Sequence, residues 1–95
     1  MSDVPEVTDN AAASRFEILT EQGAAILTYR YRGADLDLIH TEVPPALEGR
    51  GYASALATAA LSFARREGLK VIPTCPYVRA YLARHPEHAD LVVHR

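Results

Sequence analysis

The sequence predicts a single α+β domain with a mixed, mainly antiparallel sheet and two helices. Three observations support this prediction: three alternating segments are joined by short turns, a long helical pattern follows a glycine-bearing loop, and a short apolar run follows that helix. With 95 residues, 48% of them hydrophobic, the chain is large enough for one core. We expect that domain over residues 13–95, after a flexible tail over residues 1–12.

The first half of the domain is predicted to form three antiparallel strands. Apolar and polar residues alternate from Arg15 to Thr20 and from Ala24 to Arg32, with a glycine in the turn after each segment. A third strand is predicted from Leu36 to Val43, and Pro44 ends it because proline lacks the N–H that a sheet requires. Strand periodicity places four residues of this third strand on one face: Leu36, Leu38, His40 and Glu42.

The second half is predicted to form a helix, a short strand and a second helix. Apolar residues recur at helical spacing from about Tyr52 to Glu67, and Gly68 is typical of the residue after a helix. A buried strand over residues 69–72 and a helix from Tyr77 to Arg84 follow. The third strand, the long helix and the short strand have the length of a crossover between parallel strands, which makes the sheet mixed.

Composition narrows the classes of function. The net charge is −2, so the broad positive field that drives nucleic-acid binding is missing, and we expect no nucleic-acid partner. No apolar run approaches the roughly 20 residues of a membrane helix, and the acidic N-terminus does not resemble a secretory signal. We therefore expect a cytoplasmic protein without a membrane partner. His85, His88 and His94 have no cluster of Cys or carboxylate residues near them that would complete a set of four metal ligands. We therefore predict no metal.

The loop Glu48-Gly49-Arg50-Gly51-Tyr52-Ala53 precedes the long helix and has the features of an anion site. The N-terminus of a helix presents free N–H groups and the positive end of its dipole, and glycines allow a ligand to approach the backbone. Arg50 adds a cation, so the loop suits a diphosphate. The alternative is a turn that is merely tight. A P-loop would need Gly-Lys-Ser/Thr, and the preceding hairpins do not suit a dinucleotide-binding unit.

This loop resembles the cofactor motif R/Q-x-x-G-x-G/A of the GNAT superfamily, with Gly51 and Ala53 at the small-residue positions and Glu48 in place of Arg or Gln. The segments 40–44 and 75–78, followed by Tyr81 and Arg84-His85-Pro86, resemble a small single-domain GNAT-like subfamily. The resemblance covers residues from about Phe16 to Leu91 and implies a minimal GNAT acyl-CoA-binding fold. It also implies an N-acetyltransferase that uses acetyl-CoA.

The resemblance leaves two functions open. In the first, the chain transfers an acetyl group to an unidentified amine on a small molecule or a protein, directly or through Cys75. In the second, the chain is a non-catalytic module that binds acyl-CoA. Only three residues separate the first two strands, so we expect an open acceptor side. The chain is expected to be a monomer or a weak dimer.

Each candidate catalytic residue has a functional and a structural interpretation. Cys75 is a nucleophile or a buried small hydrophobic residue. His40 or Glu42 is a general base or a structural strand residue, and Tyr81 protonates the leaving thiolate or packs in the core. The resemblance implies that the cofactor contacts Val43, Glu48, Gly49, Arg50, Gly51, Tyr52, Ala53, Ser54, Cys75, Pro76, Tyr77, Arg79 and Arg84.

Overall fold

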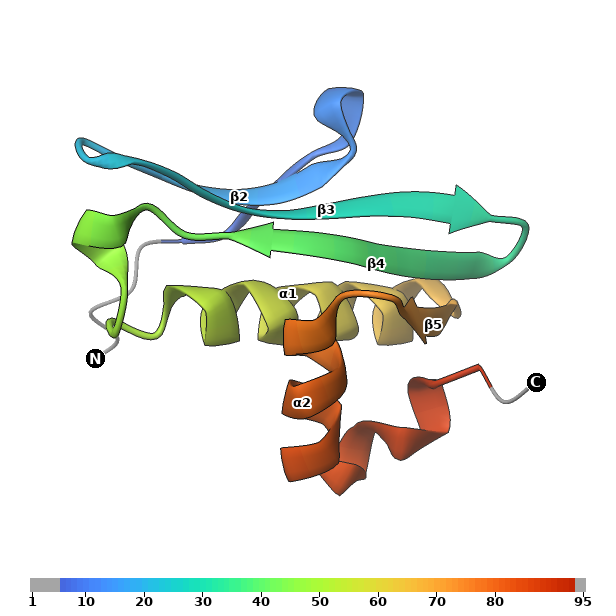
Figure 1. Cartoon of the computed structure of the whole chain (residues 1–95). Helices are drawn as coiled ribbons and strands as arrows, with labels where there is room; N and C mark the ends of the chain where they lie inside the picture. The colour runs from blue at the N-terminus through green and yellow to red at the C-terminus, as the bar shows by residue number, and fades with distance from the viewer. Residues whose placement is uncertain (1–5, 94–95) are drawn as a thin grey trace.

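The computed structural model describes residues 6–93, which form one five-stranded sheet with both α-helices on the same side of it (Figure 1). The strands follow the order β1-β2-β3-β4-β5 across the sheet. The pairings β1–β2, β2–β3 and β3–β4 are antiparallel, whereas the pairing β4–β5 is parallel. Their bounds are β1 (Thr8–Asn10), β2 (Arg15–Thr20), β3 (Gly23–Arg32), β4 (Asp35–Glu42) and β5 (Lys70–Pro73). The predicted fold class is confirmed.

The long helix α1 (Tyr52–Glu67) follows β4, and the shorter α2 (Pro76–Arg84) follows β5. Gly68 ends α1 with a positive φ of 71°, and its N–H donates to the carbonyl groups of Ala64 and Arg65. The periodicity did not predict three short 3-10 helices among the described residues, of which two connect the elements above and the third follows α2. They are η1 (Ala11–Ala13), η2 (Pro45–Leu47) and η3 (Pro86–Leu91).

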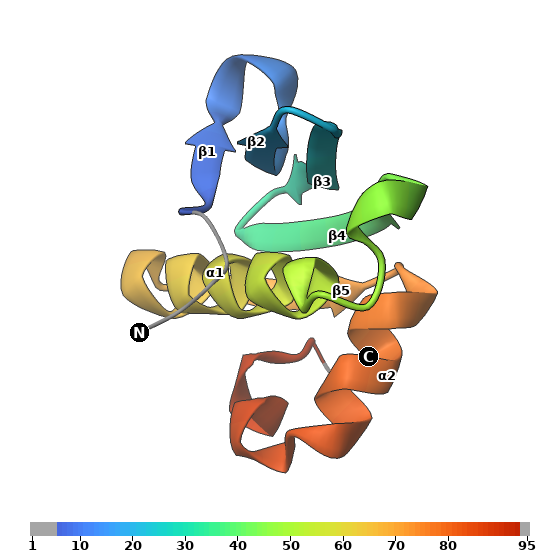
Figure 2. The same cartoon turned by 90° about the vertical axis from the view of Figure 1, so that its left-hand side faces the viewer.

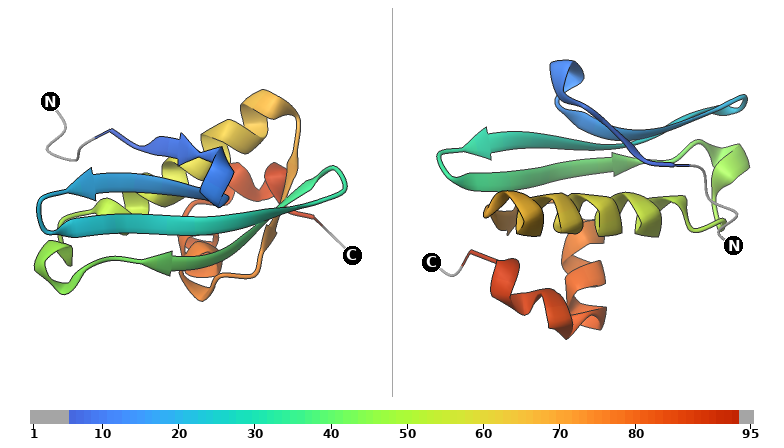
Figure 3. Two further views of the ribbon diagram at one scale, coloured as in Figure 1. Left: turned by 90° about the horizontal axis from the view of Figure 1, so that it is seen from above. Right: turned by 180° about the vertical axis from the view of Figure 1, so that it is seen from behind.

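The core lies between α1 and the sheet face formed by β2, β3 and β4, as the end-on view in Figure 2 shows. Phe16 and Ile18 of β2 and Ala25 and Leu27 of β3 are buried on this face. The buried side of α1 carries Tyr52, Leu56, Ala57, Ala60, Leu61 and Ala64. The opposite face of the sheet, here called the outer face, has no α-helix over it among the described residues (Figure 3, left).

The flexible tail was predicted to extend through residue 12, and the structure shows that this boundary is too late. Thr8–Asn10 forms β1, which pairs with β2. Two side-chain hydrogen bonds hold it: the Tyr29 hydroxyl donates to Asp9 Oδ1 at 2.6 Å, and Asn10 Nδ2 donates to Glu17 Oε1 at 3.3 Å. Residues 1–5 of the predicted tail lie outside the described residues.

A β-bulge in β4 corrects the prediction that His40 and Glu42 share a face with Leu36 and Leu38. Tyr29 of β3 pairs with Leu38, but the preceding residue, Thr28, pairs with His40, so Ile39 is the extra residue. One extra residue reverses the alternation of the side chains that follow. Leu38 therefore faces the core, whereas His40 and Glu42 lie on the outer face.

Candidate functional site

Strands β4 and β5 separate at the carboxyl end of β5, and this separation is here called the fork. The parallel pairing ends with Leu38 opposite Pro73, although β4 continues to Glu42. The Cys75 N–H then donates to the Leu38 carbonyl group at 2.8 Å, and the chain turns into α2. Within residues 6–93, no further backbone hydrogen bond joins β4 to the chain after β5. The end of β4 thus keeps one edge without a strand partner.

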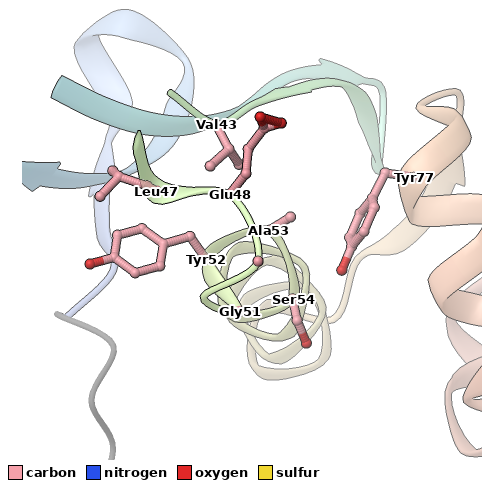
Figure 4. Close-up of a pocket in the computed structure, with 9 residues that line it drawn as sticks. Val43, Leu47, Glu48, Gly51, Tyr52, Ala53, Ser54 and Tyr77 are labelled. Carbon is pink, nitrogen blue, oxygen red and sulfur yellow. The ribbon is translucent and has the colours of Figure 1, made fainter. Parts of the chain in front are cut away.

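A pocket of about 370 Å³ opens at this end of β4, which is within the range of about 300–1,000 Å³ typical of ligand sites. Figure 4 shows Tyr77 of α2 on one side of the pocket and Ala53 of α1 on the other. The lining residues are Val43, Leu47, Glu48, Gly49, Gly51, Tyr52, Ala53, Ser54 and Tyr77. All of these except Leu47 were predicted to contact the cofactor.

The N-terminus of α1 forms the floor of this pocket and lacks a side-chain cap. Gly49 and Gly51 have φ angles of 78° and 82°, a conformation that other residues adopt only with strain. Gly51 is the N-cap residue, no side chain accepts a hydrogen bond from the first turn, and that turn has no acidic residue. Its N–H groups are therefore available to an anion, with the helix dipole in support.

The remaining predicted cofactor residues do not line the pocket. Arg50 is exposed between the two lining glycines, and Pro76, Arg79 and Arg84 are exposed on α2. Leu47 was missed although it is only 1% exposed. Its position between the two prolines and the glycine loop was the available sequence signal, because Leu47 is the largest apolar side chain of that connection and large apolar side chains favour burial.

Cys75 lies at the fork but is buried outside the pocket lining, with 2% of its surface exposed. Its Sγ atom lies 3.3 Å from Thr41 Oγ1. Thr41 was not predicted to belong to the site, because the bulge at Ile39 is what turns it toward the helices. The buried thiol thus has a side-chain partner on β4 instead of direct access to the pocket.

His40 and Glu42 lie together on the outer face of β4, beside the pocket residue Val43. Their side chains are 60% and 63% exposed, and His40 Nε2 is 3.9 Å from Glu42 Oε1. Neither residue lines the pocket. The structure therefore brings the two candidate bases together next to the fork, on the side of the sheet away from α1.

Two tyrosines of α2 differ in their hydrogen bonding. Thr58 Oγ1 donates to the Ser54 carbonyl group at 2.9 Å, so the Tyr81 hydroxyl is the donor in its 2.8 Å bond with Thr58 Oγ1. Tyr81 also stacks on His85, with 4.2 Å between ring centroids. Tyr77 lines the pocket, and its hydroxyl has no hydrogen-bond partner within residues 6–93. Tyr77 thus has the hydroxyl available to a ligand.

No group of three or more His, Cys, Asp or Glu side chains within residues 6–93 is arranged to hold a metal ion. His85 and His88 belong to the α2–η3 region, whereas His94 lies outside the described residues. No helix in the described part of the chain is long and apolar enough to cross a membrane.

A mostly antiparallel sheet whose strands separate beside an uncapped, glycine-led helix is the arrangement of a GNAT fold. The family model described as GCN5-related N-acetyl-transferase matches residues 15–91. The chain therefore belongs to the GCN5-related N-acetyltransferase family, and the resemblance seen in the sequence is confirmed.

Individual relatives agree with this assignment. The chain is 49% identical over 63 residues to Protein NATD1 of Homo sapiens, which is 65% of this chain and 56% of that protein. It is 41% identical over 73 residues to Protein NATD1 of Danio rerio, covering 74% and 66% of the two chains. The matches thus span little more than half of the human relative and about two thirds of the zebrafish one.

The fold is also similar to the NMR solution structure of a GCN5-like protein from Staphylococcus aureus. The TM-score is 0.75 and the sequence identity 28%, with coverage of 100% of this chain and 93% of that chain.

Proposed function

We propose that the chain binds acetyl-CoA in the pocket and transfers the acetyl group to an amine. The observation that carries this proposal is the position of the pocket, which joins the uncapped N-terminus of α1 to the open edge of β4 at the fork. A diphosphate and an amide-bearing chain are the two parts of coenzyme A that need, respectively, an anion site and backbone hydrogen-bonding partners.

The lining residues fit both parts of this ligand. The N–H groups of the first turn of α1 would hold the phosphates, since Gly49 and Gly51 leave the approach open. The free edge of β4 would pair with the amides of the pantetheine arm, and Val43 and Leu47 add apolar contact. Glu48 is the negative residue of the lining. Its carboxylate is directed toward β4 and away from the first turn of α1, which limits its repulsion of phosphate (Figure 4).

The chain supplies proton transfer on both sides of the reaction. Acetyl-CoA, when bound, provides an acetyl group activated as a thioester. The His40–Glu42 pair would take a proton from the acceptor ammonium, directly or through water, so that the amine nitrogen can attack the carbonyl carbon. The Tyr77 hydroxyl would donate a proton to the sulfur as the carbon–sulfur bond breaks. The attacking nitrogen would release its second proton to water as the amide forms, and water would return a proton to Tyr77. Tyr77 is preferred over the predicted Tyr81 because the Tyr81 hydroxyl donates to Thr58.

Transfer through Cys75 is the less favoured route. An acetyl-cysteine intermediate requires the Sγ atom to reach the thioester carbonyl carbon. The thiol is buried against Thr41 and is absent from the pocket lining, so the thiol must move before it reacts. Direct attack by the acceptor amine needs no such movement.

The second candidate function is a module that binds acyl-CoA without transfer, and the bare outer face favours it. An enzyme for a small acceptor needs a pocket that orients the amine. Among the described residues, no α-helix covers the outer face, where the exposed His40 and Glu42 lie (Figure 3, left). A module of this kind would bind acetyl-CoA and free coenzyme A but acetylate no amine.

Isothermal titration with acetyl-CoA and free coenzyme A, followed by an acetylation assay with a panel of amines, tests these functions. Saturable binding with acetylation is expected. Binding without acetylation of any amine would favour the module. If neither ligand binds, the assignment of the pocket is wrong.

A further inference from the structure

The buried carboxylate of Asp37 is the strongest feature that the proposed function does not use. Asp37 lies in the middle of β4 on the outer face and is 3% exposed. A buried charge is tolerated only when it is paired and hydrogen-bonded. Each oxygen of Asp37 has its own partner: Arg32 Nε donates to Oδ2 at 2.8 Å, and Thr74 Oγ1 donates to Oδ1 at 2.5 Å.

The two partners of Asp37 differ in their position relative to the site. Arg32 is at the end of β3 away from the pocket, and its side chain is 55% exposed. Thr74 is the first residue after β5 and lies at the fork. The Arg32 contact balances the charge, whereas the Thr74 contact ties the chain to β4 where the two strands separate.

Two consecutive residues of β4 hold two consecutive residues of the connection to α2. Asp37 accepts from the Thr74 hydroxyl through its side chain, and Leu38 accepts from the Cys75 N–H through its carbonyl group at 2.8 Å. The α2 helix begins directly afterwards at Pro76, whose ring fixes its own φ, and Tyr77 lines the pocket. Little conformational freedom remains between the Thr74 contact and the wall of the pocket.

We propose that Asp37 and Thr74 are positioning residues of the candidate acyl-CoA site, because their hydrogen bond sets the place where β5 leaves β4. This inference rests on the proposed function for its effect on the ligand. By fixing Thr74, the bond keeps the Cys75 thiol against Thr41 and holds Tyr77 at the correct distance from α1. Without it, the bond from the Cys75 N–H to the Leu38 carbonyl group still ties the connection to β4, but the wall of the pocket is held less firmly.

The chain contains a single cysteine, which provides a measurement that needs no ligand. Thr74→Val removes the hydroxyl and keeps the branched shape, whereas Thr74→Ser keeps the hydroxyl. Asp90→Asn is the matched control, since Asp90 accepts from Arg65 at the other end of α1. For each variant we would measure the rate at which a disulfide reagent labels Cys75, the affinity for acetyl-CoA and the free energy of unfolding.

In Thr74→Val, the disulfide reagent is expected to label Cys75 faster than the change in the free energy of unfolding explains. The dissociation constant for acetyl-CoA should rise by about tenfold, which is the size of effect expected when a hydrogen bond to a charged group is lost. The serine variant and the Asp90→Asn control should keep the wild-type affinity, with labelling that follows global unfolding. If valine at position 74 prevents folding, Thr74→Ala replaces it.

An unchanged labelling rate, or an unchanged affinity in a protein that does bind acetyl-CoA, would overturn the positioning role. If the wild-type chain binds no acetyl-CoA, the proposed function fails separately. The labelling rate then decides alone: faster labelling in Thr74→Val supports a bond that positions the fork, and an equal rate overturns it.

Discussion

Gly49 and Gly33 have the same backbone requirement but lie at opposite ends of β4. Their φ angles are 78° and 62°, and a Cβ atom built on either residue meets no atom within 4 Å. Gly49 lines the pocket, whereas Gly33 turns the β3–β4 hairpin away from the fork. A comparison of the same substitution at these two glycines therefore distinguishes the cost of backbone strain from a loss of ligand binding.

Alanine at either glycine should lower stability by about 1 kcal/mol, because an L-residue is strained at positive φ. Only Gly49→Ala is also expected to weaken acetyl-CoA binding, by about tenfold, since Gly49 lines the pocket and an added methyl group there would take up open space. Thermal melting and isothermal titration of both variants measure the two effects. Equal affinities in Gly49→Ala and Gly33→Ala would show that this loop does not contact the ligand.

Cys75 provides a second test at the scale of one residue. If transfer is direct, Cys75→Ala should retain most of the acetyl-transfer rate, and the intact mass of wild-type protein mixed with acetyl-CoA should show no added acetyl group. Loss of transfer with retained coenzyme A binding would reverse this expectation. An acetyl adduct that is absent from Cys75→Ala would then identify the covalent route.

At the scale of elements, the sequence predicted those whose signal is local. The bounds of α1 were predicted because apolar residues recur along one side of it and a glycine lies at each end. The polar strand β1 was missed because contacts distant in sequence hold it, such as Asp9 with Tyr29. The bulge at Ile39 was also missed, since it depends on how β3 pairs with β4. That bulge places His40 on the outer face of the sheet and Thr41 on the core side.

The predicted cofactor loop depended on local signals in the same way. The start of α1 is adjacent in sequence to the glycines and the prolines of this loop. Most residues that line the pocket could therefore be predicted from this one segment. Tyr77 came from the family resemblance. The partners of Cys75 and Asp37 could not be predicted, because Thr41 and Thr74 reach them only through the packing of β4 against the chain after β5.

The last element, η3, docks on the end of α1 through an ion pair that depends on pH. Both guanidinium nitrogens of Arg65 donate to Asp90, at 2.9 and 3.1 Å. The hydrogen bond from Arg65 is the main cause that lowers the pKa of the Asp90 carboxyl. A lowered pKa in the folded state means that the stabilisation is present above the pKa of unfolded aspartate, about 3.9, and is lost as the pH falls below it.

Wild-type protein should therefore melt at a slightly higher temperature than Asp90→Asn at pH 6, and the difference should shrink as the pH falls toward 3. The effect is small because the pair is exposed to solvent. Melting curves of both proteins across this range measure it. A difference that stays constant with pH would mean that the Asp90 carboxylate does not contribute through its charge.

For the whole molecule, the sheet has one covered face and one bare face. Both helices lie on the core side, whereas the outer face shows His40 and Glu42 beside the fork and Leu19 with 67% of its surface exposed. In the proposed reaction the ligand occupies the helix side. The acceptor amine therefore has to approach over the outer face, where no described helix limits its size.

This arrangement predicts weak discrimination between large and small acceptors. If the chain transfers acetyl groups, lysine side chains on a folded protein and a small primary amine should be acetylated with kcat/KM values within about tenfold of each other, because no wall excludes the larger molecule. Glu42→Gln should lower kcat for both acceptors and shift the pH dependence of the rate, since it removes a carboxylate shared by both reactions. Acetylation of the small amine alone would contradict an open acceptor side and require a wall over the outer face.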